Sequence, residues 1–235
     1  MTAGTSLVEG VYATVRVELL TGQLEPGSKL RLSDFCTRFG VSLSVIREAM
    51  TRLAEQGLVQ SSPQRGFWVT PLTADDLLDL TRTRVLIETL ALRESISHGD
   101  LRWESAVVAR HHTLQRTPMT TAAGHVTQSW ADAHREFHHA LLAGCRSTRL
   151  IAISTGLRDC SELYLHWSRE LGHDTDRDVV SEHREIAELT AARDADAACA
   201  ALERHIERTT AALLAYAAVA SPTGPLDIGE RRRGA

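Results

Sequence analysis

Cysteine is sparse in this chain, and no two cysteines have the close spacing that a thiolate metal site requires. The four cysteines are scattered along 235 residues, as Cys36, Cys145, Cys160 and Cys199. Disulfide-dependent secreted domains and zinc sites built on Cys-x-x-Cys pairs both need clustered cysteines. We therefore expect neither a disulfide framework nor a thiolate zinc site, and the pattern suits a reducing cytoplasm.

Long apolar runs are also absent. No stretch of the sequence approaches the roughly 20 consecutive apolar residues that a membrane-spanning helix needs. The first residues are polar and lack the basic segment and apolar core of a secretory signal. We expect a soluble, cytoplasmic protein with no membrane partner.

The chain has no excess of positive charge. Its 26 Lys and Arg are outnumbered by 30 Asp and Glu, for a formal net charge of −4. This balance argues against a protein that binds nucleic acid through overall basicity, so any DNA contact must come from a local patch. Residues 1–72 are slightly basic and the remainder is acidic, which favours a patch in the N-terminal third.

Three helices are predicted in this N-terminal third. Apolar residues recur at helical spacing over 7–21, and a segment with glycine and proline follows. Two shorter helices are predicted over 32–39 and 43–56, with Gly40 between them. Two short helices joined by a turn that contains glycine form a helix-turn-helix.

A hairpin is predicted directly after these helices. Residues 58–60 and 67–69 read as short strands on either side of a turn over 61–66. A helix-turn-helix followed by such a hairpin, or wing, is a winged helix-turn-helix. We place this DNA-binding domain at residues 1–72.

The second helix of such a motif enters the major groove with its N-terminal residues on base edges. We therefore expect Ser42, Ser44 and Arg47 to contact DNA. The Arg47 guanidinium can fork onto guanine or clamp a phosphate, while the serines position the helix on phosphate oxygens. The alternative for Arg47 is an ion pair with Glu48 on a solvated helix face.

Arg65 and Gly66 occupy the tip of the wing. Gly66 is expected to supply a positive φ and to let the backbone approach a phosphate. Arg65 is a further candidate for DNA contact, with an ordinary exposed turn residue as the alternative.

From residue 73 onward the sequence predicts only helices. Thr73 is expected to cap the first and Asp194 the last, and no alternating apolar run interrupts them. We expect an all-helical bundle of about six helices over 73–220. A disordered tail follows at 221–235, whose arginines are solvated or graze DNA. The predicted helices span 73–97, 101–116, 123–144, 147–171, 176–192 and 194–219.

Four histidines have spacings that allow them to converge on one divalent metal ion. His134 and His138 are four residues apart, so a helix places both on one face. His183 and His205 lie on the two last predicted helices. Each histidine alone is more often a surface residue or a satisfied core residue. Four on adjoining helices are better explained by a shared cation.

Arg84 lies on an otherwise apolar stripe of the first bundle helix. A buried guanidinium requires a partner of opposite charge. The sequence leaves two partners open, the carboxylate of Glu88 and an anionic ligand.

The segments PGSKL (26–30), FGVSLSVIREAMTRLAEQGLV (39–59) and QRGFWV (64–69) resemble the winged-helix domain of GntR-family transcription regulators. Val45-Ile46-Arg47-Glu48-Ala49-Met50 matches the core motif of that domain. Leu43 stands where such regulators usually carry an arginine that reads a guanine. A palindromic operator mirrors two-fold protein symmetry, so we expect double-stranded operator DNA and a second copy of the chain as partners.

The segments HREFHHALLAGC (134–145), SEHREI (181–186) and LERHI (202–206) resemble the FCD ligand-binding domain of the FadR branch of that family. The resemblance implies a divalent metal ion, usually zinc or nickel, held by an Asp or Asn and three histidines. His134 takes the first position, as in the regulators of glutarate and related dicarboxylate use, and His138, His183 and His205 take the others. Arg84 matches an arginine that meets the carboxylate of a ligand.

These features predict a transcription regulator, most simply a repressor, whose operator affinity is controlled by a small organic acid on the metal and Arg84. Two alternatives stay open. One is a helical metallohydrolase. Glu136 argues against it, because it lies on a different side of its helix from His134 and His138 and so cannot act as the base of a His-Glu-x-x-His site. The other is a metal sensor, in which the ion itself is the signal.

Overall fold

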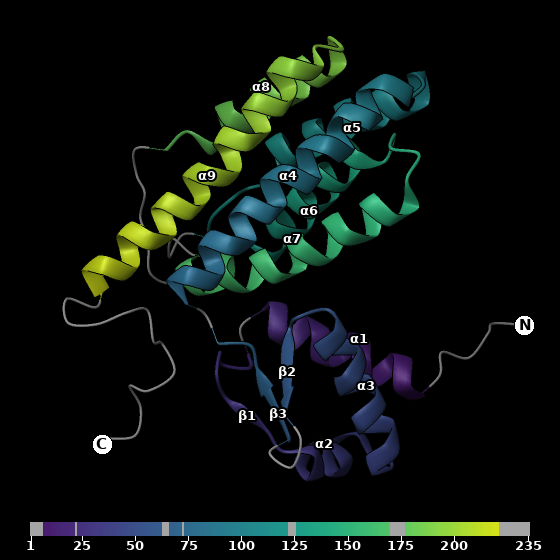
Figure 1. Ribbon diagram of the computed structural model, residues 1–235, viewed down its shortest axis with the longest axis vertical. Helices are drawn as coiled ribbons and strands as arrows, with labels where there is room; N and C mark the ends of the chain where they lie inside the picture. Colours follow the sequence, from purple (N-terminus) through teal and green to yellow (C-terminus); the bar gives the residue numbers. More distant parts are fainter. Residues whose placement is uncertain are drawn as a thin grey trace, which may run out of the picture. The chain divides into compact units, whose positions relative to one another are not determined.

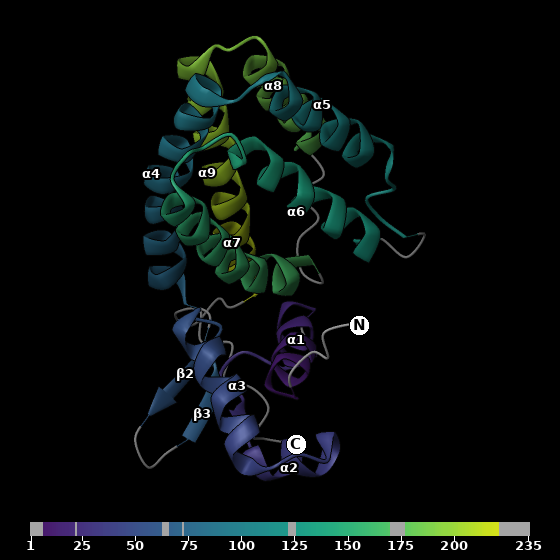
Figure 2. The ribbon, with the colours of Figure 1, turned by 90° about the vertical axis from the view of Figure 1, so that its right-hand side faces the viewer.

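The computed structural model describes residues 7–21, 23–62, 66–71, 73–121, 126–169 and 177–220. Contacts divide the chain into two compact units, one of residues 1–77, 159–167 and 217–235 and one of residues 78–158 and 168–216. The described residues form nine helices and three strands, which confirms the mostly helical fold (Figures 1 and 2). No helix within these ranges is long and apolar enough to cross a membrane.

The first unit contains a winged helix-turn-helix. Its three strands form an antiparallel sheet in the order β1-β3-β2, with Leu30 opposite Phe67 and Val59 opposite Val69. The sequence did not predict β1, because two residues are too few to show the alternation of a strand. The elements are α1 (Leu7–Leu20), β1 (Lys29–Leu30), α2 (Leu32–Phe39), α3 (Leu43–Glu55), β2 (Val59–Ser62) and β3 (Gly66–Val69).

Helix α3 is held by an apolar face that packs against α1. Val15 and Leu19 of α1 and Ile46 and Leu53 of α3 are fully buried. Gly40 ends α2 at a φ of +64°, the left-handed backbone that favours glycine, and so sets the turn into α3. With one face of α3 fixed in this core, its other face is left to solvent.

The remaining six helices match the expected number for the bundle. Helices α4 and α9 lie side by side in both ribbon views, joined by a 2.6 Å hydrogen bond between the hydroxyls of Thr81 and Thr210. Helix α5 packs against α6 and α8. The helices are α4 (Ala74–His98), α5 (Leu101–Arg116), α6 (Gln128–Leu142), α7 (Thr148–Arg169), α8 (Val179–Ala191) and α9 (Ala195–Ala220).

Side-chain caps fix where these helices begin. Thr73 Oγ1 accepts from the Asp76 N–H at 3.2 Å, and Asp194 Oδ1 accepts from the Ala197 N–H at 3.1 Å, which confirms both predicted caps. Helix α6 begins later than predicted, because Thr127 caps it. The tail at 221–235 lies outside the described residues.

Candidate functional site

The N-terminal turn of α3 presents the candidate DNA contacts to solvent. Ser42, Ser44 and Arg47 are all exposed. The two serine hydroxyls hydrogen-bond each other at 2.8 Å, and the Ser42 side chain makes no capping bond. Within the described part of the chain, Arg47 forms no ion pair with Glu48, so the guanidinium is available to a phosphate or a base edge.

The wing contributes one described candidate residue. Gly66 has a φ of +101°, the positive value expected from the turn, and open space surrounds the position of a Cβ there. Arg65 lies outside the described residues.

Three helices bring the four histidines together in the bundle interior. His134 and His138 come from α6, His183 from α8 and His205 from α9, and all four are buried. One nitrogen of each lies within 4.8 Å of the others. The ring centroids of His134 and His183 are 4.9 Å apart, and those of His183 and His205 are 4.6 Å apart.

This donor set fits a divalent metal ion. Zinc–nitrogen bonds of about 2.0–2.1 Å place two nitrogens of a tetrahedral site about 3.4 Å apart, a separation that lies within the 4.8 Å limit found for these nitrogens. Both ring nitrogens of His138, and Nε2 of His183, are buried without a hydrogen-bond partner among the described residues. A buried polar atom without a partner costs about 1–3 kcal/mol, and ligation of a cation would satisfy it.

The electrostatic environment keeps three of these imidazoles neutral. Burial lowers the pKa of both His138 and His183 well below the usual range, and the charge of Arg158 lowers the pKa of His138 further. Burial also lowers the pKa of His205, although a hydrogen bond with Glu182 partly offsets it. Neutral imidazole is the form that donates a lone pair to a metal.

Glu182 contacts one of the four histidines directly. Its carboxylate Oε2 lies 2.8 Å from Nδ1 of His205. Burial alone would raise the pKa of Glu182, but hydrogen bonds with His205 and Arg177 outweigh it and hold that pKa well below the usual range. The sequence assigned no role to Glu182, because its partner His205 lies on another helix, and none to Arg177, which pairs with Glu182.

A buried carboxylate links two arginines near the histidines. Arg84 Nε donates to Glu88 Oε1 at 2.7 Å, and Arg158 Nη1 donates to Glu88 Oε2 at 3.1 Å. Burial would raise the pKa of Glu88, but the two guanidiniums lower it below its usual value. The Glu88 partner anticipated for Arg84 is therefore present, and Arg158 of α7 is an addition that no local sequence signal marked.

The arginine pair lies within electrostatic reach of the histidines. The charge of Arg158 lowers the pKa of His138, and the charge of Arg84 lowers the pKa of His205. Glu136, in contrast, is exposed and lies 3.4 Å from Arg110, directed away from the histidines as expected.

Two protein families match separate parts of the chain. The gntR family of bacterial regulatory proteins matches residues 7–69, and the FCD domain matches residues 79–208. An uncharacterized HTH-type transcriptional regulator of Paraburkholderia xenovorans (strain LB400), BphR, is 36% identical over 209 residues, which are 86% of this chain and 83% of the relative. The HTH-type transcriptional repressor GlaR of Escherichia coli (strain K12) is 27% identical over 198 residues, which are 83% of this chain and 90% of that repressor.

Solved structures share the fold. E. coli McbR/YncC aligns with a TM-score of 0.75 at 19% identity, over 90% of this chain and 99% of that chain. A transcriptional regulator GntR from Rhodococcus sp. RHA1 aligns with a TM-score of 0.68 at 24% identity, over the same shares of the two chains.

Proposed function

The chain belongs to the gntR family of bacterial regulatory proteins and carries an FCD domain, and we propose that a small organic acid controls its affinity for operator DNA. As a member of this family it is a DNA-binding transcription regulator. We place the DNA-binding domain at residues 1–72 and the ligand-binding domain at 73–220. We propose repression, because the relative GlaR is a repressor.

The observation that carries this proposal is a buried cluster of four histidines beside two buried arginines. The histidines would hold a divalent ion such as zinc or nickel, whose coordination would expand beyond the four nitrogens to take a ligand oxygen. Arg84 and Arg158 would receive the carboxylate of the acid through charge-assisted hydrogen bonds.

A homodimer is part of the proposal. Leu86 and Leu90 lie on one side of α4 and are 70% and 47% exposed, which supports an apolar contact with a second copy. A dimer presents two recognition helices to a palindromic operator. Acid binding would change the relative placement of the two DNA-binding domains, with a coupling of about 1–3 kcal/mol.

Replacing Arg47 tests the DNA-binding half. Arg47→Ala should weaken operator binding by about 1–3 kcal/mol, because the exposed guanidinium would no longer reach a base or phosphate. The control is Arg110→Ala, which deletes an equally charged, half-exposed side chain of α5. Fluorescence anisotropy at fixed salt measures both, and an Arg47→Ala protein that binds like the control would contradict the assignment.

Replacing Arg84 tests the acid-binding half. Arg84→Ala should keep its metal and its operator affinity but bind the acid about 10- to 150-fold more weakly, since a hydrogen bond to a charged group is worth about 1.5–3 kcal/mol. Arg158→Ala should behave in the same way. Arg93→Ala is the control, because Arg93 lies on the same helix but is half exposed and pairs with Asp196.

Calorimetry with a panel of C3–C6 mono- and dicarboxylates measures these affinities. If Arg84→Ala binds the same acid as tightly as the parent, Arg84 is only a structural partner of Glu88.

A further inference from the structure

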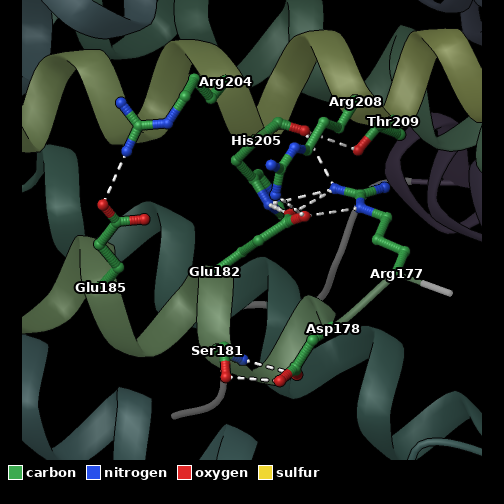
Figure 3. A network of polar contacts seen from close by, with 9 residues as sticks. All are labelled: Arg177, Asp178, Ser181, Glu182, Glu185, Arg204, His205, Arg208 and Thr209. Carbon is green, nitrogen blue, oxygen red and sulfur yellow. Dashed lines mark hydrogen bonds and ion pairs between the residues drawn. The ribbon is translucent and has the colours of Figure 1, made fainter.

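The Glu182 carboxylate receives hydrogen bonds from three side chains of the helical unit (Figure 3). Its Oε2 lies 2.8 Å from His205 Nδ1 and 2.6 Å from Arg177 Nη2. Its Oε1 accepts from Arg177 Nε at 3.0 Å and from Arg208 Nη1 at 3.2 Å. Arg177 Nη2 also donates to the backbone carbonyl of His205 at 3.1 Å. The ring and the backbone of this histidine are thus tied to one ionic group, which we call the Glu182 clamp.

We propose that Glu182 is a positioning residue for the metal site, and that Arg177 and Arg208 hold its carboxylate in place. This inference rests on the proposed metal site. An ionised carboxylate can only accept hydrogen bonds, so His205 Nδ1 must carry the proton. The remaining lone pair is then on Nε2, and the ring presents Nε2 as its metal ligand.

The Glu182 carboxylate also excludes the other tautomer of His205, in which the proton is on Nε2. Arg177 Nη2 also lies 3.4 Å from His205 Nδ1, but the 2.8 Å contact with the carboxylate is much shorter and governs the tautomer. Without the clamp, the imidazole could take either tautomer and rotate in its site. The clamp fixes the tautomer and the orientation of the ring before the metal binds.

The chain offers a matched control on the same pair of helices. Glu185 of α8 pairs with Arg204 of α9 at 2.7 Å, and Figure 3 shows this pair away from the histidine. The side chains of Glu185 and Arg204 are 51% and 49% exposed, whereas that of Glu182 is 8% exposed. Glu185→Gln therefore removes a charge between α8 and α9 without touching a metal ligand.

Zinc affinity, measured by competition with a chromogenic chelator, tests the inference. Glu182→Gln should bind zinc about 10- to 100-fold more weakly than the parent, and Glu185→Gln should match the parent. Unchanged zinc affinity in Glu182→Gln, or an equal loss in both variants, would overturn the inference. If the parent protein binds no zinc, the metal site itself is refuted. The titration of the parent shows this without any variant, so the two failures can be distinguished.

Histidine ¹⁵N–¹H spectra show which ring nitrogen of His205 carries the proton. A purely structural role of Glu182 would not determine that tautomer. In the zinc-loaded parent, His205 should carry its proton on Nδ1, and a proton on Nε2 would overturn the inference. Arg208→Gln serves if Glu182→Gln fails to fold, because the Arg208 side chain is 62% exposed. It should weaken zinc binding in the same direction by a smaller factor, and unchanged affinity would count against the clamp.

Discussion

His138→Ala should lose most of its bound metal while the winged helix still binds DNA. Both ring nitrogens of His138 are buried without a hydrogen-bond partner among the described residues, and ligation of a cation would satisfy one of them. Removing one of four ligands weakens coordination, and the apolar face of Trp130, Phe137 and Leu141 remains to hold α6. Elemental analysis after dialysis should find about one ion per chain in the parent and far less in the variant.

The neighbouring histidine supplies the control for this experiment. His139 is exposed on the same helix, so His139→Ala should keep the parent's metal content. Metal at 100 times its dissociation constant should stabilise the parent and the control by about 2.7 kcal/mol, and His138→Ala by much less. Equal metal content in His138→Ala and His139→Ala would remove His138 from the coordination sphere.

Glu88→Ala should be among the most destabilising single changes in the helical domain. The Glu88 side chain is 1% exposed and is shared by Arg84 and Arg158, whose side chains are 9% and 10% exposed. Removing one partner of a buried ionic group costs about 3–5 kcal/mol, because the opposite charges stay buried. Urea unfolding of the metal-free protein measures this free energy directly.

A carboxylate on the same helix provides the comparison for Glu88. Glu94 of α4 pairs with His98 and its side chain is 40% exposed, so Glu94→Ala should change the free energy of unfolding by about 0.5 kcal/mol or less. If Glu88→Ala is no more destabilising than Glu94→Ala, the two arginines do not depend on their shared carboxylate.

Sequence reasoning predicted those parts of the fold that depend on nearby residues. The caps at Thr73 and Asp194 were predictable because each side chain bonds a backbone N–H three residues ahead. The pair His134 and His138 was predictable because a helix turn places both on one face. Strand β1 was not, because its pairing with β3 arises only once the chain has folded.

The candidate site could not be predicted from local sequence patterns alone. His183 and His205 lie on different helices from His134, so spacing alone could not show that they converge. Their assignment to one metal site came from the number of histidines on adjoining helices and from the resemblance to a known family. Arg158 and Glu182 were missed because the rotation of α7 and α8 about their axes decides which side chains face inward. Several faces of each helix carry apolar residues, so the sequence does not specify that rotation.

The most direct test of control by an organic acid is the fluorescence anisotropy of a labelled operator DNA. The operator sequence is first selected from a random library by its binding to the protein. The protein is titrated onto the DNA without metal, with zinc or nickel alone, and with the metal and each organic acid together. The metal alone should leave the affinity nearly unchanged, and one acid should then weaken it about 5- to 150-fold, only in the presence of metal. If the metal alone changes the operator affinity fully and no acid changes it further, the protein is a metal sensor. That result would contradict control by an organic acid.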